Sequence, residues 1–417
     1  MLKYLADGTI QLISMMIIVG MIRGYVKNIY GEKAGKLMLI SEAVGLACSV
    51  LMAVMKTATN KIDTGTWNLW IYFVSFGSFL LFLVTGLIFR KSKKTVLRAF
   101  LPCIFLSLIV VVQMVYALAD FFVYPNTIML TEDSLLSTNF LTKMSGAVVA
   151  FLITLVAGLA AKAVICSMKK GAASFFLILA MVTISFKQIA TSFSTLLARR
   201  IIPNNHTLFQ LAKFSSNNSN LFIYVLLGIL LAAALFLLLK SLRPNEPYSN
   251  PAQHRKIIFK YRNRRRWSWT AIITVAVSVL LMTVIYNIAN QEVELSPIED
   301  CPIEDDALRI PFELVDDGHL HRFGYETDNG TVIRVIVIQK PNSSAYGIGL
   351  DACDICGETG YYEKDGMVVC NLCDVVMNIN TIGFKGGCNP IVIDYKIENG
   401  EIIIPVEGLL EYEDEFK

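Results

Sequence analysis

Four cysteines in the last quarter of the chain have the spacing of a metal site. They follow the pattern C-x2-C-x13-C-x2-C, formed by Cys353, Cys356, Cys370 and Cys373. Two residues between thiolates let one turn of chain aim both sulfurs at one ion, and two such pairs complete a tetrahedral set. Four thiolates suit an iron–sulfur cluster, a single iron or zinc. Disulfides or a redox dithiol are the alternative, because thiols outside the cytoplasm are often oxidised.

The residues around these pairs add detail to the site. Gly357 follows the first pair, where a positive φ would turn backbone amides toward sulfur. Lys-Asp-Gly at 364–366 predicts a hairpin that joins the two pairs. Cys388 lies in a glycine-rich turn and is a further candidate ligand, as a fifth thiol or a substitute ligand; alternatively, it pairs with Cys301.

Two histidines upstream are candidates for a second metal site. His319 and His321 alternate in a predicted strand, so both side chains would share one face. His321 is therefore a candidate ligand, and two polar residues on an exposed face are the alternative. Met367 and Met377 near the thiols are soft donors suited to Cu(I), or they serve in packing. Zinc and copper are thus the alternatives to iron.

The charges of the chain divide it into two unlike parts. Of 417 residues, 54% are hydrophobic and 17% charged, and the mean hydropathy is +0.55. Residues 1–289 hold 29 Lys and Arg against 8 Asp and Glu, whereas residues 290–417 hold 8 against 26. Such asymmetry indicates two environments. The basic part is also the apolar part, which points to a lipid bilayer as its partner and not to nucleic acid.

Residues 1–289 contain apolar runs long enough to cross a bilayer, since about 20 helical residues span the hydrocarbon core. Eight such runs predict an all-α polytopic membrane bundle of eight transmembrane helices, at 8–27, 37–56, 67–89, 99–119, 144–165, 172–198, 221–239 and 267–289. Gly20 and Gly24 in the first run permit close helix contact.

The loops between these runs predict the orientation of the chain. Lys and Arg concentrate in cytoplasmic loops. Loops 27–36, 90–98, 166–171 and 240–266 carry 19 of them, against seven in the N-terminus and the other three loops. Both termini are therefore expected outside the cytoplasm.

Few charged residues lie inside the spans, and such residues are functional, paired with one another, or snorkel to the interface near a span end. They are Arg23, Glu42, Lys162 and Lys187, and an internal ion pair between Arg23 and Glu42 is one explanation.

The rest of the chain predicts a small β-rich domain outside the cytoplasm, ligated through its cysteines. An acidic linker, 290–308, precedes a domain at 309–417. Strands are expected at 310–315, 320–326 and 332–339. Turn sequences at 316–318, 328–330 and 398–400 predict further hairpins. A bound metal would add to the stability of a domain of this size.

The motifs of common catalytic classes are missing from the sequence. A Walker A lysine motif, G-x-S-x-G, H-E-x-x-H and a G-x-G-x-x-G after a predicted strand do not occur. A hydrolase or a nucleotide-driven pump is therefore disfavoured, and electron transfer or metal relay fits better than catalysis.

The C-terminal motifs resemble the FtrD-like membrane iron–sulfur protein family. The similarity covers roughly residues 310–405 and rests on Asp-Gly-His-Leu-His-Arg-Phe at 317–323, Leu-Asp-Ala-Cys-Asp-Ile-Cys-Gly at 350–357, Gly-Tyr-Tyr at 360–362, Cys370-x-x-Cys373, Met-Asn at 377–378, Thr-Ile-Gly at 381–383 and Gly-Gly-Cys-Asn-Pro at 386–390. The resemblance implies an accessory component of bacterial ferrous-iron uptake that accepts or relays electrons.

The first span is similar to the first helix of oxidase-coupled iron permeases. The resemblance rests on Asp7, Gly8, Thr9 and Ile10, then on 17–20 and 25–27. The Arg and the second Glu of the permease motif Arg-Glu-Gly-x-Glu are replaced here by Ala6 and Ile10. A permease-like fold without its metal ligands would not conduct ions.

These observations lead to one principal functional expectation and two alternatives. We expect a membrane-anchored iron–sulfur or metal-relay subunit of an iron-uptake system in the bacterial inner membrane. Its expected partners are an iron permease and periplasmic or extracellular iron-binding components. The alternatives are a metal-ion transporter that conducts through its spans and a membrane thiol–disulfide oxidoreductase.

Overall fold

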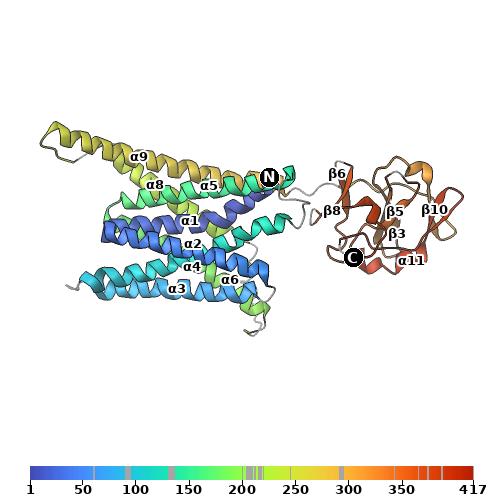
Figure 1. Ribbon diagram of the computed structural model, residues 1–417, viewed down its shortest axis with the longest axis horizontal. Coiled ribbons are helices and arrows are strands. Elements are labelled where there is room, and N and C mark those ends of the chain that lie inside the picture. The colour runs from blue at the N-terminus through green and yellow to red at the C-terminus, as the bar shows by residue number, and fades with distance from the viewer. Residues whose placement is uncertain are drawn as a thin grey trace. The chain divides into compact units, whose positions relative to one another are not determined.

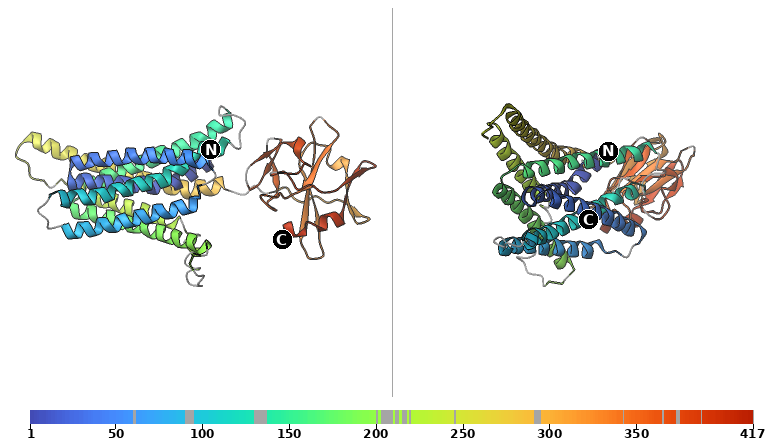
Figure 2. Two further views of the ribbon diagram at one scale, coloured as in Figure 1. Left: turned by 60° about the horizontal axis from the view of Figure 1, so that its bottom comes forward. Right: turned by 60° about the vertical axis from the view of Figure 1, so that its left-hand side comes forward.

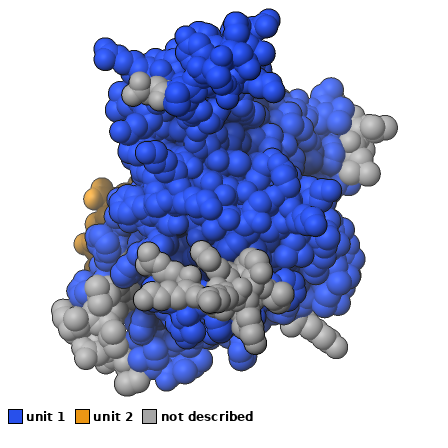
Figure 3. Space-filling model, turned by 90° about the vertical axis from the view of Figure 1, so that its left-hand side faces the viewer, with its two compact units in different colours: residues 1–290 blue, residues 291–417 orange. Residues whose placement is uncertain are grey.

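The chain divides into two compact units, coloured separately in Figure 3. The helical unit is Met1–Asn290 and the β unit is Gln291–Lys417. The computed structural model describes residues 1–59, 62–89, 95–129, 137–199, 201–202, 210, 213–214, 218, 220–244, 246–290, 295–341, 343–364, 366–372, 375–386 and 388–416.

The helical unit is built from long, roughly parallel and antiparallel helices (Figure 1). Eight of the described helical segments are long and apolar enough to cross a membrane, so the predicted number is confirmed and the chain is a multi-pass membrane protein in contact with lipid. The helices are α1 Leu2–Tyr30, α2 Glu32–Ala58, α3 Thr64–Ile88, α4 Thr95–Met129, α5 Thr138–Cys166, α6 Lys170–Ala198, α8 Leu221–Ser241 and α9 Pro251–Leu280, which continues as a π-helical turn Leu281–Ile285 and α10 Tyr286–Ala289.

The helix α1 packs against α5 through glycines. A Cβ built on Gly20 would overlap the carbonyl oxygen of Gly158, and one built on Gly24 would overlap that of Lys162. The two helices run parallel, because Asn28 near the end of α1 donates to the carbonyl oxygen of Met168, just beyond α5, at 2.9 Å. The predicted close contact at Gly20 and Gly24 is confirmed.

Two ion pairs join neighbouring helices of the helical unit. Arg23 on α1 lies 2.8 Å from Glu42 on α2, as the sequence suggested. Lys56 on α2 pairs with Asp120 on α4. This second pair was not expected, because Lys56 and Asp120 lie at the ends of the apolar runs 37–56 and 99–119, whereas α2 and α4 continue to Ala58 and Met129.

The basic segment before the last span is helical. Asn250 caps α9 by accepting from the amide of Gln253 at 2.7 Å, so the helix begins at Pro251 and not at residue 267. Its first half extends beyond the ends of the other helices (Figures 1 and 2).

The described residues of the β unit form three small antiparallel sheets. The first has the order β1-β2-β10-β9, the second β3-β4-β5 and the third β6-β7-β8. The strands are β1 Ile303–Glu304, β2 Ala307–Pro311, β3 His321–Glu326, β4 Val332–Gln339, β5 Tyr346–Leu350, β6 Tyr361–Lys364, β7 Met367–Cys370, β8 Val376–Met377, β9 Lys396–Glu398 and β10 Glu401–Pro405; a short helix, α11 Val406–Leu410, follows.

Three hairpins of the β unit follow the predicted turns. Strands β3 and β4 pair across the turn at 328–330, β9 and β10 pair across the turn at 398–400, and β6 and β7 pair with Lys364 opposite Met367. The turn at 316–318 is different, because it joins β2 of the first sheet to β3 of the second. The strand predicted at 310–315 was also wrong in its bounds: β2 ends at Pro311, and a 3-10 turn follows at Phe312–Leu314.

The central strand β4 separates two hydrophobic cores. Its side chains alternate, as they must in a strand. Val335 and Val337 join a core with the first sheet, whereas Ile336 and Ile338 join a second core. That second core contains Cys353 and Cys370. The thiols of the candidate site are therefore anchored on a face of the middle sheet.

Candidate metal centre

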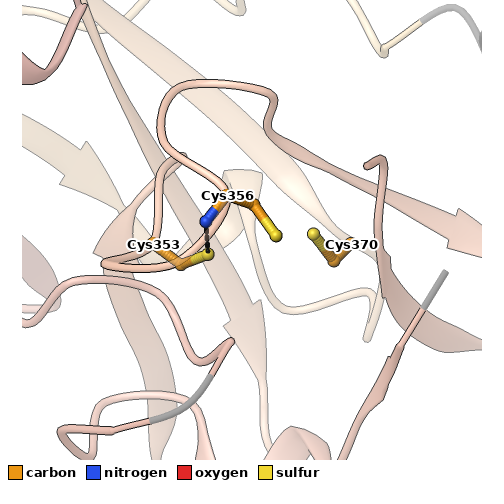
Figure 4. A group of neighbouring side chains, drawn as sticks. All are labelled: Cys353, Cys356 and Cys370. Carbon is orange, nitrogen blue, oxygen red and sulfur yellow. Dashed lines mark hydrogen bonds between the residues drawn. The ribbon is translucent and has the colours of Figure 1, made fainter. Parts of the chain in front are cut away.

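Three of the four predicted ligands converge in the structure. The Sγ atoms of Cys353, Cys356 and Cys370 all lie within 4.8 Å of one another. Figure 4 shows the three sulfur atoms directed toward a common point. Cys353 and Cys370 are each 1% exposed, and Cys356 is partly buried. We call these three residues the thiol cluster; Cys373 lies outside the described residues.

The loop after β5 forms the first half of the cluster. Cys353 and Gly357 exchange backbone hydrogen bonds of 3.2 and 2.9 Å, which close a tight turn. Gly357 has a φ of +67°, as the sequence predicted. Within this turn the amide of Cys356 donates to the sulfur of Cys353 at 3.1 Å (Figure 4). This hydrogen bond fixes the Cys353 sulfur beside Cys356 within the turn.

The β6–β7 hairpin carries the second half. Cys370 ends β7 and lies opposite Tyr361 in β6. Asn371 then ties the two halves together: its amide donates to the carbonyl of Gly360 at 3.0 Å, and its side chain donates to Thr359 at 3.2 Å. The geometry of the cluster therefore depends on this hairpin.

Cys388 lies on a loop that joins the cluster through Tyr361. The Tyr361 hydroxyl donates to the carbonyl oxygen of Cys388 at 2.7 Å. Burial raises the pKa of Tyr361, and the charge of Cys353 and a hydrogen bond with it raise this pKa further. The hydroxyl thus keeps its proton and connects the Cys388 loop to the cluster. A direct role for the Cys388 thiol stays a prediction.

The alternative pairing of Cys388 with Cys301 does not fit the structure. Cys301 packs against the core between the first and second sheets, whereas Cys388 packs against the core that holds the cluster. Burial raises the pKa of the Cys301 thiol to about 11, which keeps it protonated and unsuited to ligation.

A buried ionic network holds the segments on either side of the thiol cluster together, and it was not predicted from the sequence. Asp351 is 0% exposed and accepts from Arg322 at 2.8 Å and from Arg334 at 3.1 Å. It also accepts from the amide of Tyr361 at 2.8 Å. Asp351 therefore joins the Cys353 loop to the strand that opens the hairpin. The motif Leu-Asp-Ala-Cys gave the only signal, a carboxylate two residues before a ligand.

Gly360 makes room for this carboxylate. Its φ is +77°, and a Cβ there would lie 2.9 Å from Asp351 Oδ2. Both the backbone conformation and the close approach require glycine at this position.

The two histidines are not brought together. His319 lies in the bend before β3, so the expectation that both lie in one strand was wrong. His319 contacts Glu363 at 3.0 Å. His321 lies between two carboxylates, with Nδ1 3.0 Å from Glu299 and Nε2 2.8 Å from Asp317. These groups occupy opposite sides of the ring and do not converge on one point, so ligation by His321 stays a prediction.

The three thiols fit the iron–sulfur cluster or metal ion that the cysteine motif predicted. Three close thiols, of which two are almost fully buried, offer soft ligands to an iron–sulfur cluster, iron or zinc. The described part of the β unit adds no histidine or carboxylate to this set.

Comparison with known proteins agrees with this chemistry. Searches of curated proteins and of solved structures give no match. Residues 315–416 match the family described as "Membrane iron-sulfur containing protein FtrD-like". The predicted resemblance is confirmed for this region, whereas similarity of the spans to iron permeases stays a prediction. The β unit of this multi-pass membrane protein is thus similar to the FtrD-like membrane iron–sulfur proteins.

Proposed function

We propose that this protein is a membrane-anchored redox or metal-relay subunit of a bacterial iron-uptake system. The proposal rests chiefly on the convergence of Cys353, Cys356 and Cys370 within 4.8 Å in a unit that follows eight membrane spans. The match of the same unit to an FtrD-like family supports iron–sulfur chemistry in particular.

The residues of the thiol cluster would hold the group, with Cys373 as the fourth ligand. An iron–sulfur cluster would supply one-electron transfer, whereas zinc would supply structure alone. The chain itself contributes the amide donor of Cys356, the proton held on Tyr361 and the buried Asp351 network, which together fix the two loops around the sulfurs.

We place the β unit on the extracytoplasmic side of the inner membrane. The excess of Lys and Arg in alternate loops supports both termini outside. The unit is also strongly acidic, with 26 Asp and Glu against 8 Lys and Arg in residues 290–417. Such a field raises the local concentration of cations, which suits a protein that receives iron.

The spans fit a scaffold better than an ion path. A cavity of about 340 Å³ in the helical unit is lined by Glu42, but also by Arg23 and Lys162. Arg23 neutralises Glu42 at 2.8 Å, so the polar end of the cavity carries excess positive charge. Cations would be repelled there, and we therefore assign the movement of iron to a partner permease on which the spans dock.

Two experiments test this function. The first measures iron uptake into vesicles that contain this chain alone. Uptake should equal that of empty vesicles; uptake that Glu42→Gln abolishes would instead establish the transporter alternative.

The second experiment follows the metal centre spectroscopically. The anaerobically purified chain should show visible absorption that bleaches on reduction and returns on oxidation. Cys370→Ser should lose these bands, whereas Cys301→Ser, a thiol on the other core, should keep them. A colourless zinc-containing protein would exclude electron relay.

A further inference from the structure

The cavity in the helical unit is an elongated groove between α2 and α5. Its floor is formed by α1 and α4, including Met15 and Met114. Leu39 and Leu46 on α2 and Leu159 on α5 line it and are 40–46% exposed. We call this cavity the α2–α5 groove. Its exposed rim leads to the lipid-facing surface of the bundle.

The polarity of the groove changes along the helix axes. Arg23 lies seven residues before the end of α1 and Lys162 four residues before the end of α5. At 1.5 Å per residue these side chains start roughly 10 and 6 Å from the helix ends. Met15 and Phe151 line the groove about 22 Å from the same ends. The groove is therefore charged near one membrane surface and apolar toward the bilayer centre.

The charged end of the groove carries the excess positive charge that an anionic ligand requires. Glu42 is paired with Arg23, whereas no residue in the described part of the chain forms an ion pair with Lys162. The helix ends around this mouth carry further exposed cations, Lys33, Lys36, Lys169 and Lys170, and the exposed Glu32 there is paired with Lys27 at 2.6 Å. Lys162 lies close enough to the end of α5 for its ammonium group to extend to headgroup level, where a lipid phosphate would be its partner.

We infer that the α2–α5 groove binds an anionic phospholipid, with its phosphate at Lys162 and Arg23 and an acyl chain along the apolar floor. The groove is charged near the helix ends and apolar toward the bilayer centre. A phospholipid in the adjacent leaflet has the same order, with its charged headgroup outside and its acyl chains inside. The inference is independent of the thiol cluster and of the proposed relay function.

The test uses the full-length chain in detergent and native mass spectrometry. The wild type should retain phosphatidylglycerol in preference to phosphatidylcholine when both are supplied in mixed micelles. Lys162→Gln should weaken phosphatidylglycerol retention by roughly 10- to 100-fold, the effect of losing one hydrogen bond to a charged group.

Two variants serve as controls. Lys162→Arg keeps the charge and should retain the lipid. Lys187→Gln removes a lysine on α6 that does not line the groove, and it should also leave retention unchanged. Equal retention of the two lipids by the wild type, unchanged retention in Lys162→Gln, or recovery of an isoprenoid quinone in place of phospholipid would each overturn the inference.

Discussion

A prominent ion pair in each unit differs from the other in how far it is exposed. In the helical unit Arg23 and Glu42 form a pair at the edge of a groove, and both side chains are about one fifth exposed. In the β unit Arg322 and Asp351 are 1% and 0% exposed, and the Asp351 carboxylate accepts from Arg322 on β3, Arg334 on β4 and the amide of Tyr361 on β6. The first pair is accessible to a ligand, whereas the second is part of the framework.

This difference indicates where each unit gets its stability. The helices pack through glycines and apolar side chains, and no metal is needed to hold them. The second and third sheets of the β unit meet around sulfur atoms and one buried carboxylate, whereas the first and second meet around apolar side chains. We therefore expect the β unit to depend on its metal and the helical unit to be indifferent to it.

The largest expected effect comes from removing a ligand. Cys356→Ser or Cys370→Ser should abolish bound metal and unfold the β unit, because structural metals contribute on the order of 10 kcal/mol to small domains. Calorimetry of the intact chain should lose the transition of the β unit and keep that of the helices. Loss of both transitions would contradict the independence of the two units.

A change in the buried network should have the next largest effect. Asp351→Asn leaves two arginines near the thiols without a countercharge, and breaking such a pair costs about 3–5 kcal/mol. Glu401→Gln removes the charge of a solvent-accessible partner of Arg309 and should cost no more than about 1 kcal/mol. Denaturant titration of the β unit measures both; equal costs would show that Asp351 has no special role.

Overpacking the α1–α5 contact tests the helical unit. Gly20→Ala forces α1 away from the backbone of Gly158 and should cost about 1–3 kcal/mol. Gly77→Ala on α3 meets no atom within 4 Å and should be neutral or slightly stabilising. Metal content should be unchanged in both variants. A loss of metal in Gly20→Ala would contradict the claim that the metal centre is independent of the helical unit.

The smallest effect concerns pH. Burial lowers the pKa of His321, but the hydrogen bonds and charges of Asp317 and Glu299 outweigh it, so this pKa is raised above 6.5. The raised pKa stabilises the β unit fully below pH 6.5, and the contribution is lost as pH rises through the raised value. The loss should be at most about 1 kcal/mol. This pH-dependent loss of stability should be absent in His321→Gln. If the variant and the wild type show the same dependence of stability on pH, His321 is not its source.

The sequence predicted those features that depend on local pattern. Apolar run length predicted eight spans, and Asn-Gly or Asp-Gly turns predicted the hairpins after β3, β6 and β9. The bounds of β2 were missed because Pro311 turns the chain into a 3-10 helix. The spacing of the cysteines indicated the three thiols that the structure brings together.

Features that depend on contacts between distant residues could not be predicted. Asp351 meets Arg322 and Arg334 through the pairing of β3, β4 and β5, and no spacing in the sequence encodes that meeting. Likewise, His319 and His321 look like a ligand pair in sequence, but Glu363 and Glu299 in other segments draw them apart.

Iron and acid-labile sulfide analysis of the anaerobically purified full-length chain tests the central claim most directly. The account predicts that iron and sulfide copurify with the wild type and that both are lost in Cys370→Ser. A wild-type chain without metal, in which mass spectrometry finds Cys353 and Cys356 joined as a stable disulfide, would contradict it.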